Sequence, residues 1–329
     1  MKKISFIAIA AAVLFSCTQK PAPVSSRFEV LPDWSQKEGG YAYTLPIEEV
    51  HSARYLVFDG VLPHGELQVN GRAVKAGVAD VAPSVVPLNG WLRFGKNKLK
   101  VDGEAFPGPV RLLEGRRIYF SPEFYGVRRI HTFCVDVQDS TATLYVKAWL
   151  RNADAVNRKT KVHLTLKDAD GLVVAEDVQT VYIRSHRTER YAFTLRLGDI
   201  HRWNGKEDPY LYTLEAATGS DKISVDVGIR TVERGAEGLL LNGRPVQEEE
   251  GRLIELDQYP LTHAQLSEYD REGILVRIVA PKEDAEARMP ALVMEFSSHP
   301  CIAEWVTQDA ALYQQIRIRD PYRPLQYRP

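Results

Sequence analysis

The fold is decided by one stretch, Asp208–Val246, which reads DPYLYTLEAATGSDKISVDVGIRTVERGAEGLLLNGRPV. Apolar and polar residues alternate over 211–216 and again over 223–227, and a polar turn, TGSD, separates the two runs. This alternation predicts two β-strands joined as a hairpin. Three leucines then lead into Asn242-Gly243, a signal for a tight type I′ turn. The stretch therefore predicts the last strands of a β-sandwich and the start of another domain.

The chain before this stretch carries the same β pattern twice. Alternating runs lie at 41–45, 54–58 and 98–101, with a further turn signal at Asn70-Gly71. Longer runs at 142–150, 162–166 and 191–195 follow at the spacing that is typical of a sandwich. The sequence thus predicts two all-β domains ahead of residue 234.

The first residues are expected to be a targeting signal rather than part of the fold. Lys2 and Lys3 precede a short apolar run, too short for a comfortable membrane span, which ends in LFSC at Cys17. This ending resembles a bacterial lipobox, in which the cysteine becomes the lipidated first residue. We expect lipidation of Cys17 and a place in the bacterial cell envelope, against the alternatives of an ordinary signal peptide or a buried helix. Residues 18–26 are predicted to form a tether, and no acidic run after Cys17 specifies a membrane face.

Composition and motifs exclude several classes of function. Lys plus Arg is 42 and Asp plus Glu is 43, so the near-neutral charge gives no reason to expect nucleic acid as a partner. Motifs such as GxSxG, HExxH, a P-loop or a dinucleotide fingerprint do not occur, and we expect neither a cofactor nor a metal. Cys134 and Cys301 fall in different predicted domains; an oxidising compartment permits a disulfide, but free thiols are expected.

The sequences of several segments resemble those of glycoside hydrolase family 2, the family of β-galactosidases, β-glucuronidases and β-mannosidases. The segments are, in order, LRFGKNKLKV, HRWNGKEDPYLYTLE, VGIRTVE, LLLNGRPV, YPLTHAQLSEYDREGILV and FSSHPCIAEW. The resemblance implies a jelly-roll domain over 27–128, an immunoglobulin-like β-sandwich over 129–233, and a segment of a (β/α)8 barrel over 234–329, after a signal peptide at 1–17 and a tether at 18–26. The expected fold class is therefore mainly β, with a truncated α/β remnant of the barrel.

The barrel segment is expected to be incomplete. A (β/α)8 barrel needs roughly 200 residues or more, and 234–329 holds fewer than half of these. Residues 264–272 predict a helix and 274–276 a buried strand. An incomplete parallel sheet leaves bare strand edges, which proteins normally cover. We expect either the Arg/Tyr/Pro-rich tail or a partner protein to cover them.

The resemblance also locates the catalytic position and finds it changed. The family's acid/base glutamate ends the motif HPSIILWSLGNE, and an ungapped reading from His299 places Ala310 in its slot. Asp309 is the one remaining acidic candidate, and the family nucleophile has no counterpart. Trp305 takes the place of an aromatic residue near the family's sugar site and could contact a sugar, although core packing is the slightly favoured interpretation. The acidic run Glu248–Glu250 is expected to be a solvated turn.

Other aromatic and histidine residues fit ordinary structural roles. Trp34, Trp91 and Tyr119 would contact a ligand only if they were exposed, and burial in the core is the commoner fate of such side chains. His163 and His186 stand alone in predicted strands or loops and are expected at the surface.

Three functions remain open from the sequence. The first is a lipid-anchored, non-catalytic member of the family that binds carbohydrate, in polysaccharide utilisation, or binds a partner protein. The second is a shortened or split β-galactosidase-like glycosidase that uses Asp309 and another carboxylate to hydrolyse O-glycosyl bonds. The third is an envelope scaffold, or a subunit of a membrane complex, without a sugar site.

Overall fold

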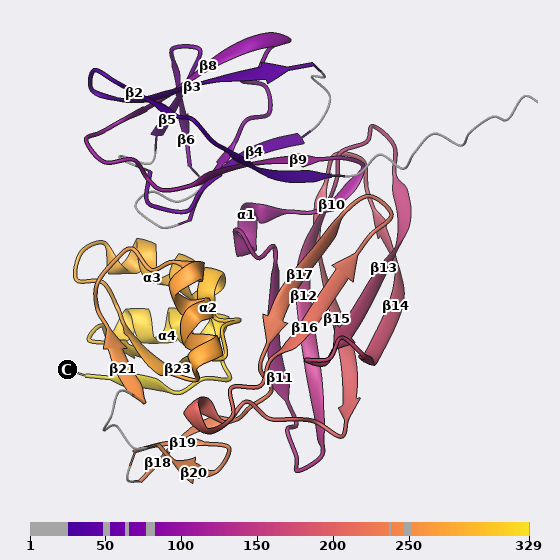
Figure 1. The fold of residues 1–329 in the computed structure, drawn as a ribbon, viewed down its shortest axis with the longest axis vertical. Helices are drawn as coiled ribbons and strands as arrows, with labels where there is room; N and C mark the ends of the chain where they lie inside the picture. Colours follow the sequence, from indigo (N-terminus) through magenta and orange to yellow (C-terminus); the bar gives the residue numbers. More distant parts are fainter. Residues whose placement is uncertain are drawn as a thin grey trace, which may run out of the picture.

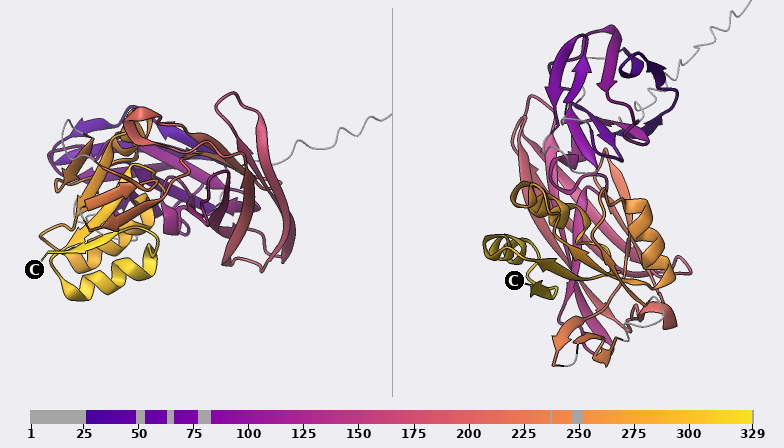
Figure 2. Two further views of the ribbon diagram at one scale, coloured as in Figure 1. Left: turned by 90° about the horizontal axis from the view of Figure 1, so that it is seen from below. Right: turned by 90° about the vertical axis from the view of Figure 1, so that its left-hand side faces the viewer.

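The computed structural model describes residues 26–48, 53–62, 66–76, 83–236, 238–246 and 252–328. Cys17 and Glu248–Glu250 lie outside these ranges. The chain folds into two β-sandwiches and an α/β segment, which packs below the first sandwich and beside the second (Figure 1). The side views show the same arrangement (Figure 2). The expected fold class is confirmed: the described part is mainly β and contains no closed barrel.

The first sandwich consists of two antiparallel sheets, in the strand orders β1-β9-β4-β7 and β2-β3-β8-β5-β6. Its core lies between them and is made of side chains that alternate inward, such as Leu45, Leu67 and Leu99. The strands are β1 Arg27–Leu31, β2 Ser35–Lys37, β3 Gly40–Ile47, β4 Ala53–Phe58, β5 Glu66–Val69, β6 Arg72–Lys75, β7 Ser84–Pro87, β8 Gly95–Asp102 and β9 Val110–Gly115.

The second sandwich places β12 between β15 on one side and β10 and β11 on the other, against a sheet in the order β14-β13-β16-β17. Because β10 pairs with β12, the second sandwich starts before residue 129. The elements are β10 Ile118–Phe120, α1 Pro122–Tyr125, β11 Ile130–Val135, β12 Thr141–Asn152, β13 Arg158–Lys167, β14 Val173–Ile183, β15 Thr188–Gly198, the 3-10 turn η2 Gly205–Glu207, β16 Tyr212–Ala217 and β17 Lys222–Val227.

The stretch that decides the fold adopts the predicted conformation. β16 and β17 form an antiparallel hairpin whose register runs from Tyr212 opposite Val227 to Ala217 opposite Lys222. A small sheet follows, made of β18 Val232–Gly235, β19 Gly238–Leu241 and β20 Arg244–Pro245. The turn between β19 and β20 is Asn242-Gly243, and both residues have positive φ, 50° and 78°, as a type I′ turn requires.

The α/β segment is a parallel sheet in the order β21-β22-β23-β24 with three helices. Its elements are β21 Leu253–Leu256, α2 His263–Glu272, β22 Leu275–Val279, α3 Ala285–Phe296, β23 Ile302–Thr307, α4 Ala310–Arg319 and β24 Leu325–Tyr327. The predicted helix at 264–272 and strand near 274–276 are α2 and β22. The apolar core of the segment joins the helices to one face of the sheet, as in the outer layer of a barrel.

The C-terminal tail is ordered and covers one edge of the parallel sheet. Its residues 325–327 form β24, which pairs with β23. Arg328 then reaches Glu255 on the strand at the opposite edge, with 2.9 Å between Nη2 and Oε2. The ring of Tyr322 stacks on Phe133 of the second sandwich at a centroid distance of 4.5 Å. The tail therefore links the two edge strands of the parallel sheet to each other, and it links the sheet to the second sandwich.

Candidate functional site

A cavity of about 690 Å³ opens at the carboxyl ends of the parallel strands. Residues that follow β21, β22 and β23 line it, together with Arg328 after β24. The carboxyl ends of parallel strands form the active face of (β/α)8 barrels, because the loops there leave the packed sheet and converge. We therefore take this cavity, called the carboxyl-end cavity below, as the candidate site.

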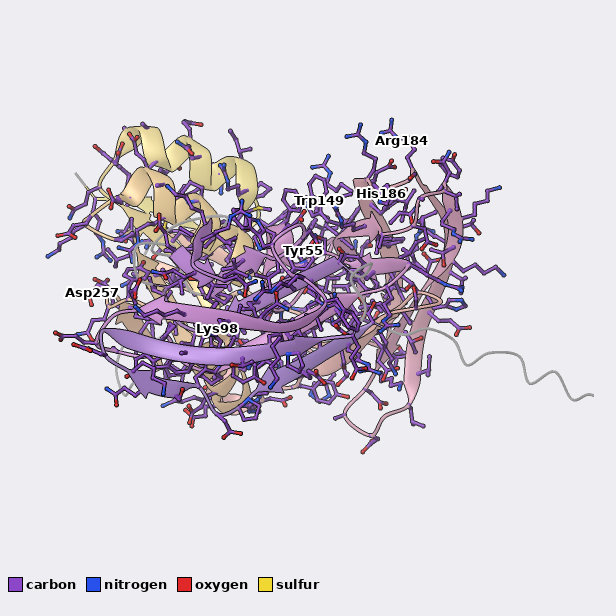
Figure 3. The ribbon with its side chains drawn as sticks, turned by 90° about the horizontal axis from the view of Figure 1, so that it is seen from above. Tyr55, Lys98, Trp149, Arg184, His186 and Asp257 are labelled. Atoms are coloured by element: carbon purple, nitrogen blue, oxygen red, sulfur yellow. The ribbon has the colours of Figure 1, made fainter. Side chains whose placement is uncertain are left out.

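Charged groups of both signs line the carboxyl-end cavity. The acidic residues are Glu255, Asp257, Glu283 and Asp309, and the basic ones are Lys282, Arg288 and Arg328. Asp257 lies exposed just beyond β21 and projects at the rim of the molecule (Figure 3). The sequence placed only Asp309 here, because the other side chains follow strands whose ends could not be located without the fold.

Asp309 has a structural role in this cavity. It is the N-cap of α4, and its Oδ1 accepts hydrogen bonds from the backbone N–H groups of Ala311 at 2.7 Å and Leu312 at 3.3 Å. A cap of this kind satisfies N–H groups that have no partner within the helix. Ala310, in the slot of the family's acid/base residue, is the first residue of α4 and has no group that can give or take a proton.

Glu255 is held as a carboxylate. The hydrogen bond from Arg328 lowers its pKa, and the charges of Arg328 and Arg277 add to this lowering, while desolvation opposes it. A general acid needs a raised pKa in order to carry a proton near neutral pH. The arrangement around Glu255 therefore disfavours proton donation to a leaving group.

Arg288 is the cavity cation with spare hydrogen-bonding capacity. It lies on α3, and its guanidinium stands 5.4 Å from the ring centre of Tyr259. Its Nε is buried and has no hydrogen-bond partner among the described residues. Tyr259 is itself fixed by a 2.5 Å hydrogen bond from its hydroxyl to the carbonyl oxygen of Val279. Arg288 therefore offers donors to an oxygen atom of a ligand.

The face of the sheet below the cavity carries an alternating row of charges. Arg277 stands between Glu255 and Glu304 in the parallel register. Glu304 has no exposed surface and accepts hydrogen bonds from Arg277 Nε at 2.9 Å and from Arg234 Nε at 2.8 Å. Because Arg234 belongs to β18, this pairing fixes the small sheet to the parallel sheet beneath the cavity.

Trp305 does not face the cavity. The side chain is fully buried in the core on the helix side, and its indole N–H donates to Asp320 at 2.9 Å. A sugar cannot stack on a ring that has no exposed surface, so Trp305 makes no sugar contact in this conformation and has the core position that the sequence slightly favoured. Neighbouring residues of β23 point to opposite faces of the sheet, so Trp305 lies on the helix face and Glu304 on the other face.

The sequence did not predict a buried chain of hydrogen bonds, which lies where the α/β segment meets the second sandwich. Asp270 accepts from His299, His299 contacts His263, and His263 contacts Glu295, at 2.5, 2.8 and 2.5 Å. The groups of Asp270, His299 and Cys301 lie within 4.8 Å of one another. Both carboxylate oxygens of Asp270 are already used, by His299 and by the backbone N–H of Cys301. Hydrogen bonding accounts for this cluster without an ion.

The two described cysteines are free thiols. Burial raises the pKa of Cys134 to about 12 and raises that of Cys301 as well. A thiol with a raised pKa carries little thiolate and reacts slowly. Their expected free state therefore fits their environments.

The remaining aromatic and histidine candidates lie away from the cavity. Trp34 packs against Tyr43, Phe58 and Phe106 in the first sandwich, and Arg72 lies over the partly buried Trp91. Tyr119 is fully buried and shares a hydrogen bond with Tyr55. His163 and His186 are exposed on the second sandwich, as expected.

None of the described helices combines the length and apolar character that a membrane span requires.

Comparisons with known proteins agree with this architecture. Residues 129–230 match the model of glycosyl hydrolases family 2. The chain is 25% identical to the β-galactosidase BoGH2A of Bacteroides ovatus, over 63% of this chain and 26% of that protein. It is 24% identical to a β-galactosidase of Yersinia enterocolitica, over 88% of this chain and 36% of that protein. The chain thus spans about a quarter to a third of these relatives.

Solved structures resemble the whole arrangement. A putative β-galactosidase of Bacteroides fragilis superposes with a TM-score of 0.74 at 19% identity, covering 87% of this chain and 54% of that chain. A β-glucuronidase of Bacteroides uniformis does so with a TM-score of 0.73 at 17% identity, covering 87% and 46%. The family match over residues 129–230 and the two sequence relatives support a relationship to glycosyl hydrolases family 2, and the solved structures show the same fold.

Proposed function

We propose that this chain binds carbohydrate at the carboxyl-end cavity without hydrolysing it. One observation carries the proposal: Arg288 contacts the ring of Tyr259 but its Nε has no hydrogen-bond partner among the described residues, while Asp309, the acidic group next to the expected acid/base slot, is engaged as a helix cap. An unpaired donor suits a sugar oxygen. A retaining glycosidase needs a protonated acid and a nucleophile about 5–5.5 Å apart, and Ala310 supplies neither.

The binding test compares Arg288 variants by calorimetry, with oligosaccharides that end in β-galactose or β-glucuronic acid, the sugars named in the relatives. Loss of a hydrogen bond to a charged group costs about 1.5–3 kcal/mol, so Arg288→Gln should bind roughly 10- to 100-fold more weakly. Arg288→Lys keeps the charge but loses the planar guanidinium, so its affinity should lie between those of the wild type and Arg288→Gln. Arg196→Gln, on an exposed part of β15, is the matched control. Equal affinity of Arg288→Gln and the wild type would refute the proposal.

A glycosidase remains the second candidate, because Asp257 and Asp309 line the same cavity. Release of nitrophenol from aryl β-glycosides tests it, with wild type and Asp309→Ala compared. We expect no turnover above background, since general acid–base assistance alone is worth about 10²–10⁴-fold. Turnover that disappears in Asp309→Ala would replace the binding proposal with catalysis by this chain.

We also propose that the chain is held at the bacterial cell envelope by a lipid on Cys17. The charged start, short apolar run and LFSC ending support this. A single acyl chain binds a membrane only marginally, so stable anchoring needs more than one chain. Intact mass after detergent extraction should therefore show a diacyl or triacyl addition at Cys17. An unmodified N-terminus elsewhere would exclude the anchor.

A further inference from the structure

β14 is a long strand at the open edge of the second sandwich. Its 11 residues, Val173–Ile183, pair with β13 on one side, and β14 ends the strand order β14-β13-β16-β17. It lies at the outer margin of the molecule, away from the α/β segment (Figure 1). The backbone groups along the other side of β14 are therefore not used by the described strands of its sheet.

The composition of β14 lacks most of the usual protection of an edge. Proteins block edge strands with proline, lysine, bulges or short length, because a bare edge templates pairing with another chain. β14 reads VVAEDVQTVYI and contains no proline, glycine, lysine or arginine. Its only charges are Glu176 and Asp177. The opposite edge of the sheet, β17, has 6 residues and begins with Lys222.

An apolar row runs along the outward face of β14. Val174, Val178 and Tyr182 lie four residues apart, and because strand side chains alternate they share one face. They are 43%, 48% and 49% exposed. Ala175 and Val181, on the other face, pack on the sandwich core. The outward row thus leaves apolar surface at the edge that pairing with another strand would reduce.

The two ends of β14 carry opposite charges. Asp168 and Asp170 stand in the turn before the strand, whereas Arg184, His186 and Arg187 follow it. All except Asp168 are exposed. Arg184 lies at the margin of the molecule, and His186 lies close to it (Figure 3). Two such strands in antiparallel orientation would place the basic end of each against the acidic end of the other, and a parallel pair would place like charges together.

We propose that β14 pairs antiparallel with β14 of a second copy of this chain, about a two-fold axis at Val178. In this register Val174 meets Tyr182 of the second copy on the outward face, and Asp177 meets Gln179, an amide donor. At the ends Asp170 meets His186, next to Arg187. The symmetry is the isologous kind that most homodimers have.

The expected dimer is weak. A single pair of strands buries less than the roughly 1,200–2,000 Å² of a standard stable interface. One end of the edge is also partly covered, because the hydroxyl of Tyr191 donates to the carbonyl oxygen of Tyr182. A carbonyl oxygen has a second lone pair, so this contact leaves room for an interstrand hydrogen bond. Dimers should therefore appear as protein concentration rises.

Cross-linking tests the register in the full chain, with Cys17→Ser in every variant. At the axis the Cβ atoms of residue 178 lie about 4.5–5.5 Å apart, close to the separation of a disulfide. The two copies of residue 180 are four residues apart in register, about 13 Å. In a glutathione redox buffer Val178→Cys should form a disulfide-linked dimer much faster than Thr180→Cys. Cys134 and Cys301 contribute little background, because burial raises the pKa of both.

Sedimentation equilibrium tests the dimer without any new cysteine. Wild type should show a mass that rises with concentration, and Val178→Lys should stay monomeric, since it puts like charges at the axis. Asp170→Lys and Arg187→Glu should each weaken the dimer several-fold, and the double variant should restore it. A wild type that stays monomeric throughout, faster cross-linking through residue 180, or no restoration in the double variant would overturn the proposal.

Discussion

Glu304 offers the sharpest test of how the α/β segment is held together. Its carboxylate has no exposed surface and is bonded by two guanidinium groups, those of Arg234 and Arg277. Removing one partner of a buried ion pair costs about 3–5 kcal/mol, because the other charge is left unpaired. Arg234 is 38% exposed and can regain water, and Arg277 keeps Glu255 at 3.7 Å. We therefore expect Glu304→Ala to lose about 3 kcal/mol, at the low end of that range.

Urea unfolding followed by tryptophan fluorescence measures this loss. Trp305 adjoins Glu304, and Trp203 belongs to the core cluster that holds the small sheet, so both buried indoles report on this part of the chain. The matched control is Glu215→Ala, which removes a carboxylate with two lysine partners, Lys167 and Lys222, on the surface. Exposed pairs contribute about 0–1 kcal/mol, so the control should change little.

The outcome that refutes this reasoning is a small loss at Glu304. If Glu304→Ala and Glu215→Ala cost the same, within about 0.5 kcal/mol, the network would not fix the small sheet to the parallel sheet. A second variant, Glu304→Gln, keeps the volume and one acceptor oxygen. It should lose less than Glu304→Ala, since some hydrogen bonds remain.

Three further predictions concern pH, a helix cap and a domain contact. Burial lowers the pKa of His131 to about 3 and that of His299 to about 4. Both imidazoles are neutral in the fold and titrate near pH 6.5 when the chain is unfolded. The contribution of each to the free energy of unfolding is therefore fully present above about pH 6.5. It is lost as the pH falls towards 4, by up to about 1.4 kcal/mol per pH unit for each histidine. Urea midpoints between pH 7 and 4 test this, and His131→Asn should flatten the fall. Asp309→Ala should lower the free energy of unfolding by about 0.5–2 kcal/mol, because it removes the cap of α4. Asp309→Asn keeps a capping oxygen and should be close to wild type. Equal losses in the two variants would contradict the capping role. Gly126→Ala should destabilise the contact between α1 and α3, because Gly126 has φ +42° and an added Cβ would overlap the carboxylate of Glu295. Thermal unfolding measures this loss, and the control is Gly219→Ala, whose Cβ would make an ordinary contact with Thr160 Oγ1 at 3.9 Å.

The β part of the fold follows from local pattern. Alternation in β12, β13, β15 and β16 predicts strands because each has one face on the core and one in water, and Asn242-Gly243 and Asn70-Gly71 predict turns because both positions need positive φ. Neither signal depends on distant residues. The same patterns therefore identified both sandwiches from the sequence.

The α/β segment was harder to predict because its helices are stabilised by tertiary contacts. α3 contains Pro290, and both faces of its sequence carry apolar residues such as Ala287, Met289 and Leu292. α4 ends in Gln, Arg and Ile residues without a clear apolar stripe. Packing on the parallel sheet, through Phe296, Leu312 and Ile316, stabilises these helices. Such contacts are absent from a window of sequence, so propensity alone could not identify them.

The site shows the same limit at the level of single side chains. The motif around His299 identifies Asp309 and Ala310 by counting along one segment, which needs no knowledge of its neighbours, and they lie just past β23 as the N-cap and first residue of α4. Arg288 lies on α3 and Arg328 beyond β24, and only the parallel order of the strands brings them to the cavity that Asp309 lines. The same count put Trp305 near the sugar site, but its side chain is fully buried in the core on the helix side of the sheet. A motif on one strand can thus identify a single position, whereas the residues that would bind a ligand come from several strands and helices and become visible when these are assembled.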